Sequence, residues 1–536
     1  MSKPSTEAQP LDASKAQSSA RQPGARSPHY IRATSPVADE HTRVLKHGDS
    51  FAVFDRHGDI KPGGLGEEGL YYEGTRYLSC LLLKLEADRP LFLSSTIKQE
   101  NDLLVVDMTN PDFSVDGDIA IQRGTLHISR IKFLWQAACY ECLRIRNYGR
   151  NTLTMGLSLH FEADYADIFE VRGMKRPRRG QTLDPQVQDS VVVLAYRGLD
   201  DLTRRTRLLW SPSPAAVTGN EAFFEISLPR DAEQALFFTV VCERDAGEQR
   251  TPLAFETAQQ SALASFKQTH AQTTVVHTSK GQFNTWLDRS LADLHMMITQ
   301  TDAGPYPYGG VPWFSTPFGR DGIITALECL WFCPGLARGV LRFLAETQAR
   351  EVNPARDAEP GKILHEARTG EMANLGEVPF GRYYGSVDAT PLYILLAGAY
   401  FERTADLELI QSIWPNIEAA LGWIDNYGDQ DGDGFVEYLR RSANGLVQQG
   451  WKDSNDSIFH ADGTLAEGPI ALCEVQGYVY AAKRAAALLA TSLGQRQAGE
   501  RLEEEARVLR ERFEKAFWLE ELSTYASALD GRKRPC

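Results

Sequence analysis

The spacing of apolar side chains changes once along the chain, near residue 255. Between about 42 and 254, apolar residues recur at every second position in short runs, which is the pattern of half-buried β-strands. Such runs occupy 81–85, 103–108, 126–131, 153–159 and 235–241, and turn-forming residues separate them at 110–112, 116–118 and 147–149. Many short strands at this spacing predict an antiparallel β-sandwich over residues 41–255.

After residue 255 the apolar period lengthens to about 3.6 residues, as in amphipathic helices. One predicted helical face is formed by Phe283, Leu287, Leu291, Leu294 and Ile298. Further helical patterns cover 322–332, 336–350, 391–404, 407–427, 471–491 and 497–518. Long loops join these helices, and long loops inside a compact domain usually carry function. We therefore expect residues 256–536 to form a helical domain whose loops gather a site.

Two segments depart from these patterns. Residues 1–40 are rich in Ser, Ala, Pro, Gln and Arg and cannot bury enough apolar surface to offset the entropy of ordering, so we predict a disordered tail. The segment 164–173 clusters acids and aromatics. It is either an inter-domain or substrate-facing loop or a solvated turn, and the pattern favours the turn.

Size and charge limit the classes of function. A chain of 536 residues predicts two domains plus a tail. A formal charge of −14 argues against a nucleic-acid partner and suits a neutral ligand. The hydrophobic share of 43% and the aromatic share of 10% are typical of a soluble globular protein. No apolar run reaches the roughly 18 residues of a membrane helix, and no signal-peptide core opens the chain, so we expect a cytoplasmic protein without a membrane partner.

Neither a metal nor a cofactor is expected. Cys139 and Cys142 form a single CxxC pair whose side chains would point to opposite faces of a strand, so we interpret them as ordinary thiols in a reducing compartment. His365-Glu366 lacks the second histidine of a zinc helix. The loop 429–437 imitates the first half of an EF-hand, but Arg440 stands where the bidentate Glu belongs. This loop is predicted to be a helix-ending turn.

The stretch 448–457 is the strongest candidate for chemistry. It places Asp453 and Asp456 three residues apart, beside Trp451 and Lys452, with no apolar period. Sugar sites need this mixture, because a ring face covers the apolar side of a pyranose, polar groups bind its hydroxyls and a carboxyl protonates the glycosidic oxygen. The alternative is a solvated polar loop with a partly buried tryptophan.

Two more loops carry groups suited to sugars. The segment 306–321 holds Trp313 among rigid Pro and Gly residues and ends on Arg320-Asp321, which is either a helix cap or a hydroxyl-binding pair. Asp388, three residues before a proline, is likewise a cap or a sugar ligand. A glycine-rich phosphate loop after a strand and a GxSxG elbow are both missing from the sequence, which argues against nucleotide chemistry and serine hydrolysis.

Taken together, these loops resemble the bacterial amylo-α-1,6-glucosidase proteins of the glycogen debranching enzyme type and, more distantly, the (α/α)6-toroid glycosidases. The resemblance rests on the motifs at 69–71, 75–79, 167–173, 318–321, 383–391, 431–438 and 450–454. It implies an N-terminal β-sandwich followed by a toroid of the six-hairpin glycosidase type, which hydrolyses α-glucosidic bonds with inversion. It also implies an oligosaccharide or glucan as the binding partner.

The resemblance also implies roles for single residues. Asp453 corresponds to the general acid, with Asp456 as the fallback. A carboxyl acting as an acid near neutral pH needs burial or a neighbouring carboxylate to hold its proton. The substrate-binding candidates are Trp313, Arg320, Asp321, His365, Glu366, Asp388, Trp451 and Lys452.

The chain departs from the family in length. Seven helical patterns stand against the twelve helices of a complete toroid, and the chain stops within a loop at 530–536. We therefore expect an incomplete toroid whose general base would lie beyond Cys536. Two other functions stay open, a glucan-binding remnant that cleaves nothing and a toroid-type glucoside phosphorylase. The sugar, the linkage and the oligomeric state do not follow from the sequence.

Overall fold

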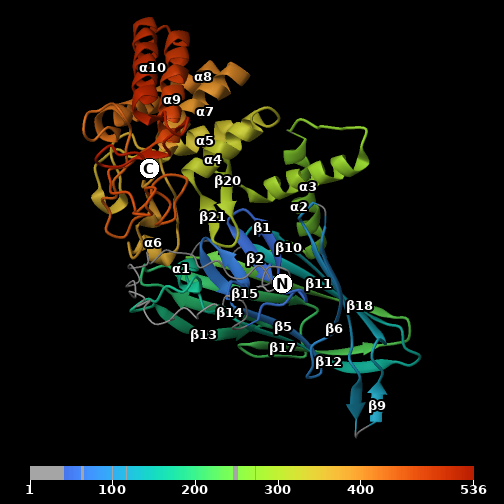
Figure 1. The fold of residues 1–536 in the computed structure, drawn as a ribbon. Coiled ribbons are helices and arrows are strands. Elements are labelled where there is room, and N and C mark those ends of the chain that lie inside the picture. The colour runs from blue at the N-terminus through green and yellow to red at the C-terminus, as the bar shows by residue number, and fades with distance from the viewer. Residues whose placement is uncertain (1–41, 62–65, 99, 116–117, 246–250, 272) are drawn as a thin grey trace, which may run out of the picture.

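The structure is a computed structural model. It describes residues 42–61, 66–98, 100–115, 118–245, 251–271 and 273–536. The predicted disordered tail over 1–40 lies outside these residues. Within them, layered β-sheets fill the first half of the chain and a stack of helices fills the second (Figure 1).

Three antiparallel sheets build the first half. The largest has eight strands in the order β13-β14-β15-β18-β11-β10-β7-β6. These are β6 Leu91–Ile97, β7 Leu104–Thr109, β10 Leu126–Trp135, β11 Ala138–Asn147, β13 Gln181–Gln188, β14 Val191–Arg197, β15 Thr203–Ser211 and β18 Glu233–Arg244. A second sheet contains β5 Cys80–Leu85, β12 Leu153–Glu162, β16 Ala216–Val217 and β17 Glu221–Leu228. A third contains β1 Arg43–His47, β2 Ser50–Phe54, β3 Gly69–Tyr72 and β4 Thr75–Leu78, and β8 Phe113–Val115 pairs with β9 Asp118–Ile121.

The alternation in the sequence decides which face of each strand is buried. Along β17 every second residue is buried, so that Phe224 and Ile226 join one core with residues of the facing sheet while their neighbours stay exposed. The predicted β-sandwich is confirmed. Cys139 belongs to this core, whereas Cys142, three residues along β11, packs on the other face against Phe133 and α2. Both are buried free thiols, on opposite faces as predicted.

Helices take over at α2. The longer ones are α2 Phe255–His270, α3 Gly281–Met297, α4 Gly319–Cys329, α5 Pro334–Thr347, α7 Ala389–Thr404, α8 Leu407–Trp423, α9 Cys473–Ser492 and α10 Arg496–Phe517. Shorter elements are α1 Ile168–Val171, α6 Glu371–Asn374, η2 Pro354–Arg356, η3 Pro379–Gly381 and η4 Ile424–Gly428. Small sheets join β19 Ile298–Thr301, β20 Gly304–Gly310 and β21 Phe314–Pro317, then β22 Ala471–Leu472 with β25 Ala528–Leu529, and β23 Trp518–Leu519 with β24 Thr524–Tyr525.

Successive helices pack in pairs around α7. Its residues are buried on nearly all sides, with Leu392, Ile394 and Leu396 at most 3% exposed. Such a helix belongs at the centre of a helical layer, and α4, α5, α8 and α9 all contact it. The pairs α4–α5, α7–α8 and α9–α10 form helical hairpins of the kind that build an (α/α)6 toroid. Among the described helices, none combines the length and apolarity needed to cross a bilayer.

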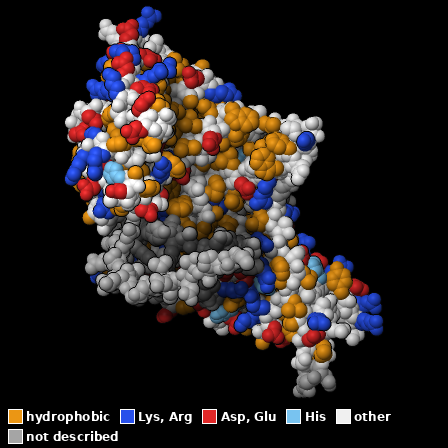
Figure 2. Space-filling model, in the orientation of Figure 1, with side chains coloured by type: hydrophobic (Ala, Val, Ile, Leu, Met, Phe, Trp, Pro, Cys, Tyr) orange, Lys and Arg blue, Asp and Glu red, His pale blue; other side chains and the backbone are white. Residues whose placement is uncertain are grey.

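Helix α3 forms where predicted but does not bury the predicted face. Phe283 is 43% exposed, and Ala292 is the buried residue of this helix. Ile298, expected on the same face, begins strand β19 instead. Figure 2 shows hydrophobic side chains gathered on the surface where α3 to α5 lie in Figure 1. An amphipathic period identifies a helix, but it does not say what covers the apolar face.

The segment 164–173 joins the two halves of the chain. Asp167 is 1% exposed and caps α1, where its Oδ1 accepts from the Phe169 N–H in a capping box with Glu170. Its other oxygen, Oδ2, accepts from the Met372 N–H of α6 at 3.1 Å. The favoured interpretation of a solvated turn is therefore wrong, because Asp167 is buried in a contact between the two domains.

Candidate functional site

The candidate site is built where the N-termini of α4 and α7 meet. Arg320, in the first turn of α4, donates from Nη1 to Asp388 Oδ2 at 3.0 Å. Burial by itself lowers the pKa of Arg320, but the negative charges of Asp388, Asp321 and Asp453 raise it above its ordinary value. Three carboxylates and one guanidinium, separated by up to 133 positions in the sequence, thus share one region of the molecule.

Neither Asp321 nor Asp388 caps its helix with its side chain. Asp388 occupies the N-cap position of α7 without a side-chain capping bond, and its carboxylate accepts instead from Arg320 and from Ser386 Oγ. Asp321 lies in the first turn of α4, whose N-cap is Phe318. Its carboxyl is open to solvent yet partly desolvated by the surrounding protein, which raises its pKa, while Arg320 acts in the opposite direction. The capping alternatives are not supported by this geometry.

The 448–457 loop brings Asp453 to this group. The Val387 N–H donates to the Gln449 carbonyl at 2.9 Å, which ties the loop to the start of α7. Asp453 is exposed, and its charge acts on Arg320 and on Asp321. Asp456 is exposed three residues further along the loop. The structure therefore places Asp453 with the predicted ligands, on the solvent side of them.

Trp451 and Lys452 form the outer part of the loop. Trp451 is 54% exposed, so much of its ring is available to a ligand. The Lys452 ammonium lies 5.4 Å from the centroid of that ring, a cation–π distance. The loop thus carries an exposed aromatic ring two positions before the exposed Asp453, and sugar sites use such rings.

His365 lies beneath Arg320 as a neutral, buried support. Its backbone N–H donates to the Tyr383 carbonyl at 2.7 Å, and its carbonyl accepts from the Gly319 N–H at 2.9 Å, which fixes the start of α4. Its ring meets Phe318 and Tyr383 edge-on. Burial first, and the positive charge of Arg320 second, lower the pKa of His365 to about 3, so this imidazole is uncharged near neutral pH.

Glu366 and Trp313 lie next to the site, where the helical domain meets the β-sandwich. Glu366 is buried and its Oε2 accepts from Arg368 Nε at 2.9 Å. Burial raises the pKa of Glu366, whereas Arg368 and Arg172 oppose the shift. The Trp313 carbonyl accepts from Arg368 Nη2 at 3.1 Å, and the Arg172 guanidinium lies 5.9 Å from the Trp313 ring. Both predicted residues are therefore tied into a buried ion-pair network beside Arg320.

Two polar side chains near the candidate site, Gln449 and Glu474, were not predicted from the sequence to have a role. Gln449 Nε2 and Glu474 Oε1 are buried atoms with no hydrogen-bond partner among the described residues. Burial, then Glu474 and Asp388, raise the pKa of Tyr478, so this tyrosine of α9 lies near both carboxylates. Gln449 was part of the candidate stretch but was not assigned a role. Glu474 lies inside a helical pattern, where nothing in the spacing separates it from an ordinary solvated carboxylate.

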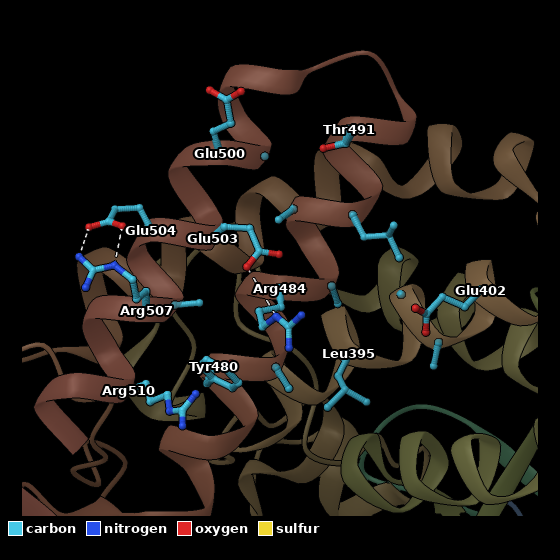
Figure 3. Close-up of a pocket in the computed structure, with 18 residues that line it drawn as sticks. Leu395, Glu402, Tyr480, Arg484, Thr491, Glu500, Glu503, Glu504, Arg507 and Arg510 are labelled. Atoms are coloured by element: carbon cyan, nitrogen blue, oxygen red, sulfur yellow. Dashed lines mark hydrogen bonds and ion pairs between the residues drawn. The ribbon is translucent and has the colours of Figure 1, made fainter. Parts of the chain in front are cut away.

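A large groove elsewhere is not part of this site. It encloses about 1190 Å³ between α7, α9 and α10 (Figure 3). Charged pairs line it, including Arg484–Glu503 at 3.6 Å and Arg507–Glu504 at 2.5 Å. None of the predicted site residues is among its lining residues.

Lys533, from the C-terminal segment, is the counter-ion of the acidic loop after η4. Asp429, Asp431 and Asp433 offer oxygens within 4.8 Å of one another. The Lys533 ammonium lies 3.1 Å from Asp431, 2.8 Å from Asp433 and in contact with Glu437. Helical structure ends at Gly428 immediately before the loop, so the predicted helix-ending turn is confirmed.

Comparisons with known proteins agree with this architecture. The family model described as "N-terminal domain of (some) glycogen debranching enzymes" matches residues 45–239, and the model described as "Amylo-alpha-1,6-glucosidase" matches residues 291–535. The second is a family of carbohydrate-active enzymes. No curated protein sequence is significantly similar to this chain.

Two solved structures have a similar fold. A putative kojibiose phosphorylase from the human microbiome has a TM-score of 0.56 and 10% identity, over 90% of this chain and 69% of the other. A bacterial glucoamylase complexed with acarbose has a TM-score of 0.52 and 10% identity, over 92% of this chain and 70% of the other. At such low identity these likenesses show the fold alone.

Proposed function

Because this chain belongs to the family that joins an N-terminal domain of glycogen debranching enzymes to an amylo-alpha-1,6-glucosidase domain, we propose that it is a glycoside hydrolase acting on α-glucosidic linkages. Its substrate is an oligosaccharide or glucan. The observation that carries the proposal is the convergence of Arg320, at the start of α4, and Asp388, at the start of α7, with Asp453 from the 448–457 loop, which also carries the exposed Trp451.

Each group has a part in the proposed reaction. Asp453 donates the proton to the glycosidic oxygen as the bond to the leaving sugar breaks. The Arg320–Asp388 pair binds hydroxyls of the sugar ring, since a buried charged pair gives both donors and an acceptor in fixed positions. Trp451 covers the apolar face of a pyranose. The reaction is inverting, so that water attacks the anomeric carbon from the face opposite the leaving group and gives its proton to a second carboxylate acting as general base, a role that none of these residues takes.

Glucose release from a branched limit dextrin tests the proposal. Asp453→Asn keeps the size of the side chain but cannot supply the proton, so we expect release to fall by about 10²- to 10⁴-fold. Asp456→Asn is the matched control on the same exposed loop and should retain most of the activity. Equal activity of wild type and Asp453→Asn would contradict the assignment, and a large loss in Asp456→Asn alone would transfer the role to that residue.

A phosphorylase is the second candidate, favoured by the likeness in fold to a putative kojibiose phosphorylase. In that reaction phosphate replaces water and the product is glucose 1-phosphate. Product formation that requires added phosphate would decide for it. Maltooligosaccharide binding without any product, unchanged in Asp453→Asn, would instead indicate a glucan-binding protein that cleaves nothing.

The proposed location is the cytoplasm. All eight cysteines are free thiols, and a reducing compartment keeps them so. Secretion of the protein with disulfide-linked cysteines would contradict this part of the proposal.

A further inference from the structure

A second cavity lies far from the Arg320–Asp388 pair, where the helices after the sandwich cross its strands. It encloses about 290 Å³ between the end of β1, residues 100–102, the end of β10, and the helices α2 and α3. Figure 1 shows α2 and α3 lying over the end of the sheet that contains β10 and β11. The volume is at the lower limit of small-molecule sites, which begin near 300 Å³. It suits one monosaccharide-sized molecule rather than a chain of sugars.

Two residues that line this cavity, Trp135 and Asp102, each carry a buried polar atom without a partner. Trp135 Nε1, a donor, and Asp102 Oδ1, an acceptor, are buried and make no hydrogen bond within the described part of the chain. Leaving a buried polar atom unpaired costs about 1–3 kcal/mol, so native proteins rarely do it without a ligand or ordered water. A hydroxyl group can both donate and accept, and a molecule with several hydroxyls satisfies the two atoms together.

The lysine that lines the cavity is already engaged. The Lys46 ammonium donates to the Gly48 carbonyl at 2.7 Å and to Thr299 Oγ1 at 2.9 Å, and it lies 4.8 Å from the ring centroid of Tyr308. Burial lowers the pKa of Lys46 to about 7, with Asp49 opposing the shift. This lysine therefore has little to offer an anion.

The remaining walls are aromatic or weakly charged. The His47 ring lies 4.6 Å from the Trp135 ring, and burial followed by the charge of Lys46 lowers its pKa to about 4, so it is neutral near neutral pH. Phe266 closes the cavity from α2. Burial and then Glu100 raise the pKa of Asp102. Aromatic walls with a few convergent polar groups are typical of sites for small neutral ligands.

We propose that this cavity is a second ligand site, which binds a neutral polyhydroxylated molecule of monosaccharide size through Trp135 Nε1 and Asp102 Oδ1. The site is separate from the Asp453 loop and does not depend on cleavage there. Its ligand is recognised by hydroxyls rather than by charge.

Indole signals in an NMR titration with D-glucose test this proposal. Nine tryptophans give nine indole N–H signals in the full chain labelled with ¹⁵N at tryptophan. The indole signal that disappears from the spectrum of Trp135→Phe is that of Trp135, which reports on the cavity. Phenylalanine keeps a ring at this position but has no N–H group. Trp451→Phe identifies the candidate active site in the same way. Trp286, 62% exposed on α3, is the control identified by Trp286→Phe.

We expect the Trp135 signal to shift and saturate with D-glucose, while that of Trp286 stays in place. In Asp102→Ala the affinity should fall about tenfold, as for one lost hydrogen bond to a carboxylate. Cyclohexanol, which has a ring but one hydroxyl, should bind more weakly. Unchanged thermal unfolding of Asp102→Ala and Trp135→Phe shows that both variants fold.

The outcomes separate this site from the proposed hydrolase. The proposal is overturned if the Trp135 signal never shifts with D-glucose, or if it shifts with the same affinity in Asp102→Ala as in the wild type. Either result means that ordered water, and not a ligand, satisfies Trp135 Nε1 and Asp102 Oδ1. A response of Trp451 alone also overturns the proposal while leaving the hydrolase intact. A saturable response of Trp135 in a chain that releases no glucose would support the second site and contradict the hydrolase.

Discussion

Asp167 makes the stability of the protein depend on pH in a direction opposite to that of most aspartates. Burial raises its pKa from 3.8 to about 6, although the N–H groups of Phe169 and Met372 both donate to its carboxylate and lower it. The folded protein therefore binds this proton more tightly than the unfolded chain. Its stabilising contribution is complete below pH 4 and is lost as the pH rises through about 6. A shift of about two pKa units corresponds to roughly 3 kcal/mol.

The substitution Asp167→Asn isolates this contribution. Asparagine is uncharged, like the protonated carboxyl, so the variant lacks this titration, but its Nδ2 cannot accept one of the two N–H groups that Asp167 binds. We expect the stability of the variant relative to the wild type to rise by up to about 3 kcal/mol between pH 4 and pH 7, whatever the constant cost of the lost hydrogen bond. Urea unfolding of both proteins from pH 4 to 7.5 gives the difference between their free energies of unfolding. The contributions of other titrating groups cancel in this difference. A difference that stays constant over this range would refute the reasoning, and so would a variant that loses stability as the pH rises.

Three further predictions concern buried contacts. Arg320→Met leaves Asp388, 1% exposed, without its charged partner, and should lower the free energy of unfolding by about 3–5 kcal/mol, which Arg320→Met/Asp388→Leu should largely restore; additive losses in urea unfolding would contradict this. Tyr306→Phe removes the hydroxyl that donates to the Phe318 carbonyl at 2.7 Å, while that carbonyl keeps the Gly322 N–H as a donor; the loss should cost about 0.5–1.5 kcal/mol in thermal unfolding, so an unchanged melting temperature would count against it. Lys533→Met leaves the carboxylates of Asp431, Asp433 and Glu437, which follow η4, without their shared cation. Their mutual repulsion should speed proteolysis of the loop 429–437 and lower the free energy of unfolding by about 1 kcal/mol; equal cleavage rates would show that the lysine is dispensable.

The fold followed from the sequence wherever one period ran long enough to be specific. The alternation over 153–159 and 235–241 gave strands β12 and β18, and the helical period over 391–404 and 497–518 gave α7 and α10 almost residue for residue. Helix α4 begins three residues before its predicted start at 322. Its first turn, Gly319-Arg320-Asp321, carries site residues and no apolar stripe, so the pattern could not include it.

The partners within the site did not follow from the sequence. Arg320 and Asp388 are 68 residues apart, and only the packing of α4 against α7 brings them together. The spacing left Asp321 and Asp388 as caps or ligands, because an aspartate at a helix start suits both roles equally. Asp167 shows the opposite error, since clustered charge normally indicates a solvated turn and its burial depends on α6, about 200 positions later in the chain.

The exposure of Asp453 limits how the proposed acid can act. A carboxyl group keeps its proton near neutral pH when burial or a nearby negative charge favours the neutral form. In the free chain Asp453 is exposed, and its charge acts on Arg320 and on Asp321. The bound sugar must therefore supply the missing burial, by displacing water between Trp451 and the Arg320–Asp388 pair. Substrates too short to cover Trp451 should then lose turnover and not affinity alone. A comparison of kcat and KM between a disaccharide and a longer maltooligosaccharide measures this, and equal kcat values would show that the substrate does not complete the site.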